Sequence, residues 1–574
     1  MQFLPPVFLP SLFCKKYHSE NPGDGDPPTP GFPESCFSKR NEMEEHRGEK
    51  YTNRRFCISK GQRHFKRAPE FPDLRFMRIS FLVCIVLISY DILLAQDVDI
   101  LAFGAVPDGT TLNTISIQSA IDSVHAKGGG RVVIPAGTFL SGSILMKSGV
   151  ELHLLKGARL LGSTDPEHYI KLNRWKALVM ADSQNHIAIT GEGEIDGQGR
   201  QLALHLDSLF YAGQIDSVDY EFPEHRPKYY LRPQLIEFVN CAFIEVRNVT
   251  LKNAACWVQT HDKCNNIVID HVRTESDAYW NNDGIDISDC NNVRITNCVV
   301  NAADDGICLK SHSREYSCDN IYIGNCTVRS SASAIKFGTV SHGGFKNVTI
   351  EHIKVYDTFR SAIAIECVDG GLLENVLVQN IDAVNTGNAI FIRLGKRNKA
   401  GNAGMLRNVT IRNLKAQIAF ERPDYAYQIR GPALPFFHNT FPSSIVGIPG
   451  HPVENVTLEN IDIRYPGRGN NGLANMPLSR LDAVPEKIGD YPEFSMFGEL
   501  PAWGLYVRHM DGLILKNIQL SIEAPDYRPA MIFDDVTNVD ISEINILGDT
   551  KPKQMIFNKS GRVTIDNEQA VMKM

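Results

Sequence analysis

Short runs in which apolar and polar residues alternate recur along the chain from about residue 240 onward. Turns separate them, and examples are CAFIEVRNVTL, CNNIVIDHVRT, CNNVRITNCVV, KNVTIEHIKV and ENVTLENIDI. Alternation with a period of two is typical of β-strands, because successive side chains point to opposite faces. No amphipathic helix of 10–15 residues separates the repeats, so leucine-rich and helical arrays are disfavoured. The pattern predicts an all-β chain.

Two residue types recur at fixed positions of the repeat. One column holds Cys241, Cys264, Cys290 and Cys318, at spacings of 23, 26 and 28, and continues in Phe345 and Leu373. A second holds Asn266, Asn292, Asn320, Asn347 and Asn375. Such periods predict a solenoid, and several strands per repeat favour a parallel β-helix, whose coils stack about 4.8 Å apart. We expect the cysteines to form an interior thiol column and the asparagines to satisfy turn backbone. A zinc site is disfavoured, since no C-x₂-C pair occurs.

Five hexapeptides align in a further register, one coil apart. They are DGIDIS, DGICLK, SAIKFG, SAIAIE and NAIFIR, starting at 283, 305, 333, 361 and 388. Their aliphatic residues should point inward, and the residues between them outward. One outward column is then Asp286, Cys308, Lys336, Ala364 and Phe391, and the next is Ser288, Lys310, Gly338, Glu366 and Arg393.

Three aspartates, Asp283, Asp304 and Asp305, open this stack of strands. Carboxylates on adjacent coils repel one another, which raises at least one pKa. The cluster is therefore a candidate acid/base site on the outer face, while Asp289 is expected to be a turn residue. Two other interpretations stay open on these residues alone: a solvated acidic turn and a Ca²⁺ site.

The solenoid pattern changes at both ends of the chain. A helix at about Asn113–Lys127 is expected to cap the N-terminal end, because an open end exposes core and strand edges. The regular spacing breaks at 416–450 and 464–505. These loops are expected to form walls of a groove, or to cover a hydrophobic flank or a subunit contact.

The first 95 residues differ in character from the rest. Residues 1–76 are Pro-rich, charged and without periodicity, which predicts an overcalled start or a disordered extension. Residues 77–95, MRISFLVCIVLISYDILLA, fit a secretory signal peptide, so a secreted or periplasmic protein is expected. The alternative is a genuine tail with a membrane anchor. If residues 77–95 are a signal peptide that is removed, the mature catalytic domain spans 96–574.

Composition narrows the function only slightly. The 574 residues carry a net charge of −7, with 43% hydrophobic and 22% charged residues. This is ordinary for a soluble globular protein. It provides no electrostatic footprint for nucleic acid.

The segments AFGAVPDGTTLNTISIQSAID, NNDGIDI and ADDGICLKS resemble glycoside hydrolase family 28, the polygalacturonases and rhamnogalacturonan hydrolases. The similarity extends over about residues 97–550. It implies a right-handed parallel β-helix and hydrolysis with inversion, without metal or other cofactor. By resemblance, Asp304 is the general acid, Asp283 and Asp305 activate the water, and Asn281 orients Asp283.

The chain departs from this family at two motifs. The histidine of Gly-His-Gly corresponds to Ser333, and the Arg and Lys of Arg-Ile-Lys correspond to Ala364 and Glu366. In the family these two cations bind the galacturonate carboxylate. Nearby charges and rings are therefore candidate substrate contacts. They are Lys310, Lys336, Arg393, Glu366, His261 and Arg508, with Tyr506 and His509 as weaker ones.

The function expected from these residues is a secreted glycosidase acting on galacturonide linkages of homogalacturonan or rhamnogalacturonan. The altered motifs favour an exo-acting or branched-pectin enzyme over a simple endo-polygalacturonase. A pectic polysaccharide is its expected partner. A Ca²⁺-dependent polysaccharide lyase and a non-catalytic carbohydrate-binding β-helix are the alternatives.

Overall fold

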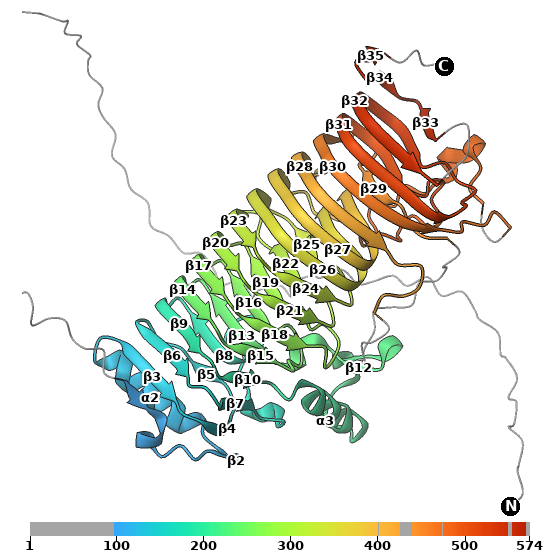
Figure 1. Ribbon diagram of the computed structural model, residues 1–574. Coiled ribbons are helices and arrows are strands. Elements are labelled where there is room, and N and C mark those ends of the chain that lie inside the picture. Colours follow the sequence, from blue (N-terminus) through green and yellow to red (C-terminus); the bar gives the residue numbers. More distant parts are fainter. Residues whose placement is uncertain (1–96, 400, 425–438, 473–474, 549–553, 570–574) are drawn as a thin grey trace, which may run out of the picture. The chain divides into compact units, whose positions relative to one another are not determined.

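The alternating segments form strands of one 33-stranded sheet, wound into a right-handed parallel β-helix (Figure 1). This computed structural model describes residues 97–399, 401–424, 439–472, 475–548 and 554–569. The predicted extension 1–76, the signal peptide 77–95 and residues 425–438 of the first predicted loop lie outside the described residues. Within the described residues, no helix is long and apolar enough to cross a membrane.

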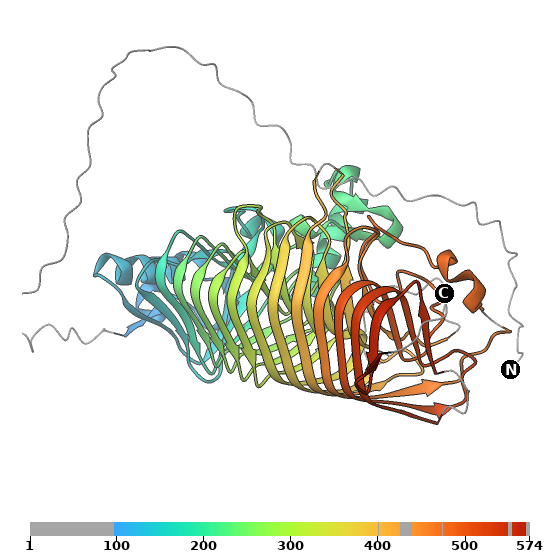
Figure 2. The same ribbon diagram turned by 90° about the horizontal axis from the view of Figure 1, so that it is seen from above.

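Three stacks of parallel strands make the faces of the coil, and the coils follow one another in chain order (Figure 2). The first stack carries the aspartates, and its short strands are β5 (Ile144–Leu145), β8 (Ala177–Asp182), β13 (Gln234–Val239), β16 (Gln259–Asp262), β19 (Ile285–Ser288), β22 (Ile307–Ser311), β25 (Ile335–Ser341), β29 (Ser443–Val446) and β33 (Met555–Asn558).

The second stack follows the asparagine turn, and its strands are β1 (Val98–Asp99), β3 (Gly130–Ile134), β6 (Val150–Leu154), β9 (Asn185–Gly191), β14 (Ala242–Arg247), β17 (Asn265–Asp270), β20 (Asn291–Thr296), β23 (Cys318–Gly324), β28 (Met405–Ile418), β30 (Val453–Gly467) and β34 (Gly561–Ile565).

The third stack contains β2 (Asp108–Leu112), β4 (Gly137–Ser141), β7 (Ala158–Gly162), β10 (Glu194–Asp196), β15 (Thr250–Lys252), β18 (Arg273–Ser276), β21 (Val299–Ala302) and β24 (Thr327–Ser330). In the later coils long strands continue from one stack into another. They are β26 (Gly344–Cys367), β27 (Leu372–Leu394), β31 (Leu505–Ala524) and β32 (Met531–Leu547), together with β28 and β30 of the second stack. Two small pairings are antiparallel: β11 (Tyr220–Glu221) with β12 (Arg226–Pro227), and β34 with β35 (Glu568–Gln569).

The helices lie outside the coil. α2 (Thr114–Ala126) is the predicted helix at the N-terminal end, and it buries Ile117, Ile121 and Val124. α3 (Gly199–Tyr211) belongs to the segment between β10 and β13. The short 3₁₀ helices are η1 (Ile100–Phe103), η2 (Pro166–His168), η3 (Ser217–Asp219), η4 (Phe222–Glu224), η5 (Tyr229–Leu231) and η6 (Leu478–Ala483).

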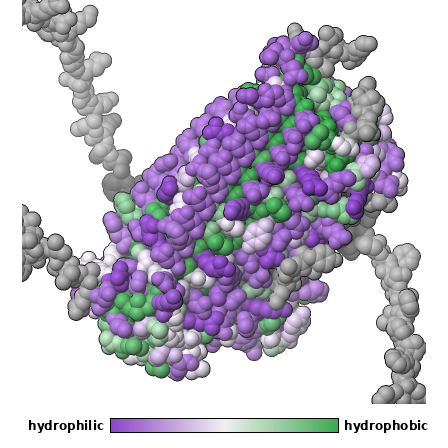
Figure 3. All heavy atoms as spheres, viewed as in Figure 1, coloured by the Kyte–Doolittle hydropathy of each residue, from purple (hydrophilic) through white to green (hydrophobic). Residues whose placement is uncertain are grey.

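Side-chain columns run along the axis, as the striped surface in Figure 3 illustrates. Cys241, Cys264, Cys290 and Cys318 are buried free thiols, and strand pairing continues their column into Phe345 and Leu373. The expected role of the asparagines needs correction. Their backbones are left-handed, with φ between 53 and 59°, and their amides chiefly bond side chains of neighbouring coils. Asparagine tolerates this backbone conformation better than most residues do.

Candidate active site

The turn before β19 holds Asp283 over the outer face of the first stack. The neighbouring Asn282 is buried, and its amide donates to the carbonyls of Ala254 and Cys256 at 2.9 and 2.8 Å. Gly284 keeps the coils close, because a Cβ there would lie 2.6 Å from the carbonyl oxygen of Gly306. A small residue is therefore required where the two aspartate turns stack.

Lys310 neutralises the first part of the cluster. Its Nζ lies 2.8 Å from Asp283 Oδ2 and also forms an ion pair with Asp286, whose side chain is fully buried. The ammonium sits 4.8 Å from the centre of the Trp257 ring. Burial raises the pKa of Asp283 well above its usual range and that of Asp286 to about 6. One cation thus serves two carboxyl groups that do not ionise together easily.

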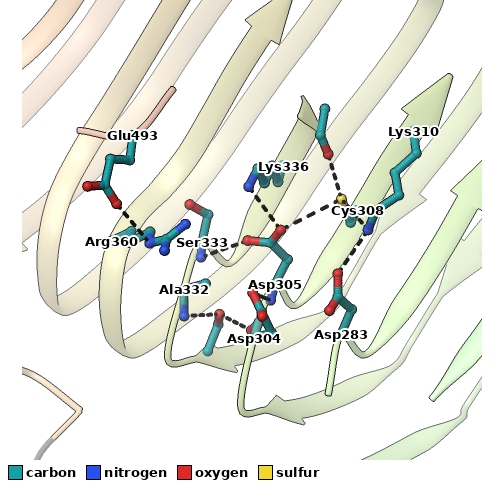
Figure 4. Close-up of polar contacts among 12 residues, drawn as sticks. Asp283, Asp304, Asp305, Cys308, Lys310, Ala332, Ser333, Lys336, Arg360 and Glu493 are labelled. Atoms are coloured by element: carbon teal, nitrogen blue, oxygen red, sulfur yellow. Dashed lines mark hydrogen bonds and ion pairs between the residues drawn. The ribbon is translucent and has the colours of Figure 1, made fainter. Parts of the chain in front are cut away.

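Lys336 serves the other part of the cluster (Figure 4). Its Nζ lies 3.1 Å from Asp305 Oδ2. The same Nζ donates to the Tyr491 hydroxyl at 3.0 Å. Asp305 Oδ1 accepts the backbone N–H of Ser333 at 3.2 Å. Burial opposes ionisation of Asp305, but the cations Lys336, Lys310 and Arg360 outweigh it, and its pKa is lowered.

Asp304 has the opposite electrostatic balance. Burial and the charge of Asp305 raise its pKa, against the weaker effects of Arg360, Lys336 and Lys310. Its Oδ1 accepts the backbone N–H of Asp305 at 3.0 Å. Adjacent carboxyl groups with pKa values displaced in opposite directions are an arrangement suited to one acid and one base.

Cys308 lies between these groups. Its Sγ, an oxygen of Asp283 and an oxygen of Asp305 all lie within 4.8 Å of one another, so these three side chains could hold a metal ion. Lys310 Nζ already lies 3.3 Å from this sulfur. Burial raises the pKa of the thiol well above its usual range. A metal would have to compete with the ammonium and displace the thiol proton.

The sequence profile described as glycosyl hydrolases family 28 matches residues 126–425, more than half of the chain. The chain belongs to this family. A probable polygalacturonase of Vitis vinifera is 26% identical over 339 residues, which cover 56% of this chain and 60% of that protein. An exo-poly-alpha-D-galacturonosidase of Dickeya chrysanthemi is 27% identical over 249 residues, 37% of this chain and 41% of that protein.

The chain therefore spans about three fifths or less of the length of these two curated relatives. Among solved structures, an exopolygalacturonase of Thermotoga maritima aligns with a TM-score of 0.53 and 24% identity, covering 64% of this chain and 87% of that one. A family 28 exopolygalacturonase of Yersinia enterocolitica aligns with a TM-score of 0.50 and 19% identity, covering 83% and 79%. These two likenesses support the β-helix fold.

Strand pairing joins Asp286, Cys308, Lys336, Ala364 and Phe391 in one column of this family 28 chain, as predicted. Asn281 lies at the edge of the cluster, where its Oδ1 accepts from Arg232 Nη2 at 2.7 Å and from Arg226. Glu366 is buried one coil beyond Lys336, and burial raises its pKa to about 8.

Three predicted contacts, His261, Arg393 and Arg508, do not line the site. His261 pairs in strand register with Ile287, and its side chain packs against Phe238, so it points into the core, where burial lowers its pKa to about 3. Arg393 is buried and donates to the carbonyls of Gly447, Glu486 and Lys487.

Arg508 likewise donates to the Val484 carbonyl at 2.8 Å and forms ion pairs with Glu486 and Asp534. The adjacent residues Tyr506 and His509 are also held within the protein. His509 pairs with Glu486 and Asp535, and Tyr506 is fully buried. These side chains fasten the segment that contains Val484 to the coil, so their donors are not directed at a substrate.

Sequence reasoning missed several residues of the site. Arg360 lies beside Asp304 and Asp305 and 3.4 Å from Glu493 (Figure 4). It is also close to the Tyr491 ring. Tyr491 and Glu493 come from the predicted 464–505 loop, which has no repeat register. Trp257 follows Cys256, which lies outside the repeating cysteine column, and only the proximity of the Trp257 ring to Lys310 identifies it as part of the site.

Proposed function

We propose that this chain is a glycoside hydrolase that cleaves galacturonide linkages of pectic polysaccharide with inversion. The opposite pKa displacements of Asp304 and Asp305 carry this proposal. Family membership supports it, as do relatives named polygalacturonase and exo-poly-alpha-D-galacturonosidase. Two neighbouring carboxyl groups then provide the acid and the base that glycoside hydrolysis needs.

The roles follow from charge. Asp304, which keeps its proton, protonates the glycosidic oxygen as the bond from that oxygen to the anomeric carbon breaks. A water molecule attacks the same carbon from the opposite face and gives its proton to Asp305, whose pKa is lowered, with Asp283 on the neighbouring coil beside it. One oxygen of each of these two carboxyl groups lies within 4.8 Å of the other, close enough for one water to bond both. Inversion requires an acid-to-base separation of about 6.5–9.5 Å, to leave room for this water.

The covered end of the strand stack supports action at chain ends. Beyond Lys336 the outward column passes through Ser444 and carries the hydrophobic side chains of Ala364, Phe391, Tyr506 and Ile532. A segment from η6 to residue 502 packs Leu481, Val484, Phe494, Phe497 and Leu500 against these side chains in a buried cluster. A polysaccharide cannot run along a face that is already buried, so we propose exo action.

The carboxylates of the polysaccharide need a cation other than the lysines and the arginine expected from the sequence. Lys310 and Lys336 pair with the aspartates, and Arg393 binds loop carbonyls. We propose that Arg360 supplies the contact to a galacturonate carboxylate, because it stands beside Asp304 and is paired with Glu493 only at 3.4 Å. Export through residues 77–95 remains part of the proposal and rests on sequence alone.

The deciding experiment is product profiling on homogalacturonan and rhamnogalacturonan, with wild type and Asp304→Asn. We expect release of short products from chain ends and inverted anomeric configuration by proton NMR. Loss of the general acid should lower the rate by about 10²–10⁴. Substantial cleavage by Asp304→Asn would remove that residue from its role. An ultraviolet-absorbing, EDTA-sensitive product would instead identify a lyase, and the early appearance of long oligosaccharides would exclude exo action.

A further inference from the structure

Lys336 is a buried cation whose charge is directed at one aspartate. Its side chain, on β25, is 1% exposed, and Asp305 lies one coil earlier on the same face. Nζ donates to the Tyr491 hydroxyl at 3.0 Å and lies 5.2 Å from the centre of that ring. A buried ammonium is costly without a paired anion, so Asp305 and Lys336 stabilise each other as ions. This ammonium is not free to bind a ligand.

Asp304 receives no such partner. Within the described part of the chain, no lysine or arginine comes within ion-pair distance of its carboxyl group, while Asp305 is the next residue. A nearby fixed anion disfavours ionisation of a second carboxyl group. The same lysine thus distinguishes two aspartates that share one turn.

We propose that Lys336 is a positioning residue that divides the protons of the site: its ammonium holds Asp305 as the carboxylate, and Asp304 consequently keeps the proton. This inference rests on the proposed function for its catalytic meaning, but not for the ionisation that it describes. It replaces a substrate-binding role for Lys336.

The other charged groups around the two aspartates do not take over this task. Lys310 is shared between Asp283 and Asp286, and Arg360 lies next to Glu493. Glu366, behind Lys336, has its pKa raised to about 8 by burial, and burial raises that of the Cys308 thiol. Both therefore remain neutral at mildly acidic pH.

The test compares Lys336→Met, which removes the charge, with Lys336→Arg, which keeps it. An opposite charge at this distance lowers a carboxyl pKa by roughly 1–3 units. In Lys336→Met we expect the acidic limb of the kcat/KM profile to move up by at least one pH unit. We also expect kcat to fall tenfold or more, with KM changed less than twofold. Lys336→Arg should restore the wild-type limb. A raised KM with the limb in place would indicate substrate binding and overturn the proposal.

A second measurement needs no substrate, and its first comparison, the order in which Asp304 and Asp305 titrate, does not need Lys336→Met. Carbon-13 NMR of labelled aspartate carboxyl groups, assigned with Asp304→Asn and Asp305→Asn, follows the titration in the full chain. We expect Asp305 to titrate below Asp304 in the wild type. The reverse order, or an unchanged titration in a folded Lys336→Met, would overturn the proposal. Should the order hold while no pectic substrate is cleaved, the proposed function fails and the division of protons stands.

Discussion

At the residue scale, burial and ion pairing decide which ionisable side chains of the site carry a charge. Lys310 and Lys336 are cations held by carboxylates, whereas Glu366 is an acid whose pKa rises to about 8 in the buried outer face of the stack. At the position where the family has a lysine, this chain therefore carries a neutral acid below about pH 8. Glu366 therefore adds no negative charge beside Lys336 below that pH.

Glu366→Gln tests this state through stability. The folded pKa of about 8 exceeds the unfolded value of about 4.3, so the folded chain keeps a proton that the unfolded chain loses between these values. Wild-type stability should therefore fall as pH rises through this window, by at most ~1.4 kcal/mol for each pH unit. We expect the Tm of Glu366→Gln, measured relative to the Tm of wild type, to increase as the pH rises from 5 to 8. Parallel pH curves for the two proteins would contradict the assignment.

At the element scale, the left-handed asparagine turn sets the register of each coil. Asn320 adopts φ of 56°, and its Nδ2 donates to Asn292 Oδ1 at 2.7 Å. The column continues in the same backbone conformation through Asn347 and Asn375. A coil that left this conformation would move its apolar residues out of the interior.

Asn320→Ala should destabilise the chain by about 1–2 kcal/mol, because alanine pays the left-handed penalty and loses the amide bond. Asn320→Gly is the matched control, since it loses the same amide but adopts the backbone freely. Chemical denaturation measures both. Equal losses would show that the side-chain ladder, not the backbone conformation, carries the effect.

At the scale of the β-helix, the interior is continuous and holds its thiols without disulfides. All nine cysteines of the described residues are free and buried. Stability then comes from stacked apolar side chains and parallel strand pairing between neighbouring coils. Covalent links contribute nothing within this part of the chain.

We expect reducing agent to leave the Tm unchanged. The chain has 13 cysteines and nine are buried, so a thiol reagent should find at most four in the native protein, and nine more after denaturation. A Tm that drops on reduction, or fewer new thiols, would point to a disulfide that this fold does not contain.

Much of the fold could be predicted from the sequence because a β-helix is nearly one-dimensional. Each repeat contacts its neighbours, so columns of cysteine, asparagine and isoleucine in the sequence become columns in space. The same register aligned Asp283 with Asp305 and placed Asp286, Cys308 and Lys336 on one face. Asp304 adjoins this register, and resemblance alone suggested its role.

Only the tertiary structure decided which neighbours each charge meets. His261 points inward although alternation alone allowed a groove position, and Arg393 and Arg508 are bound to loop carbonyls. Tyr491 and Glu493 reach the site from a loop without repeat: Tyr491 contacts Lys336 across 155 residues of sequence, and Glu493 pairs with Arg360. Periodicity determines which face a side chain takes. Ion pairing and burial depend on what covers that face, and loops outside the repeat supply that cover.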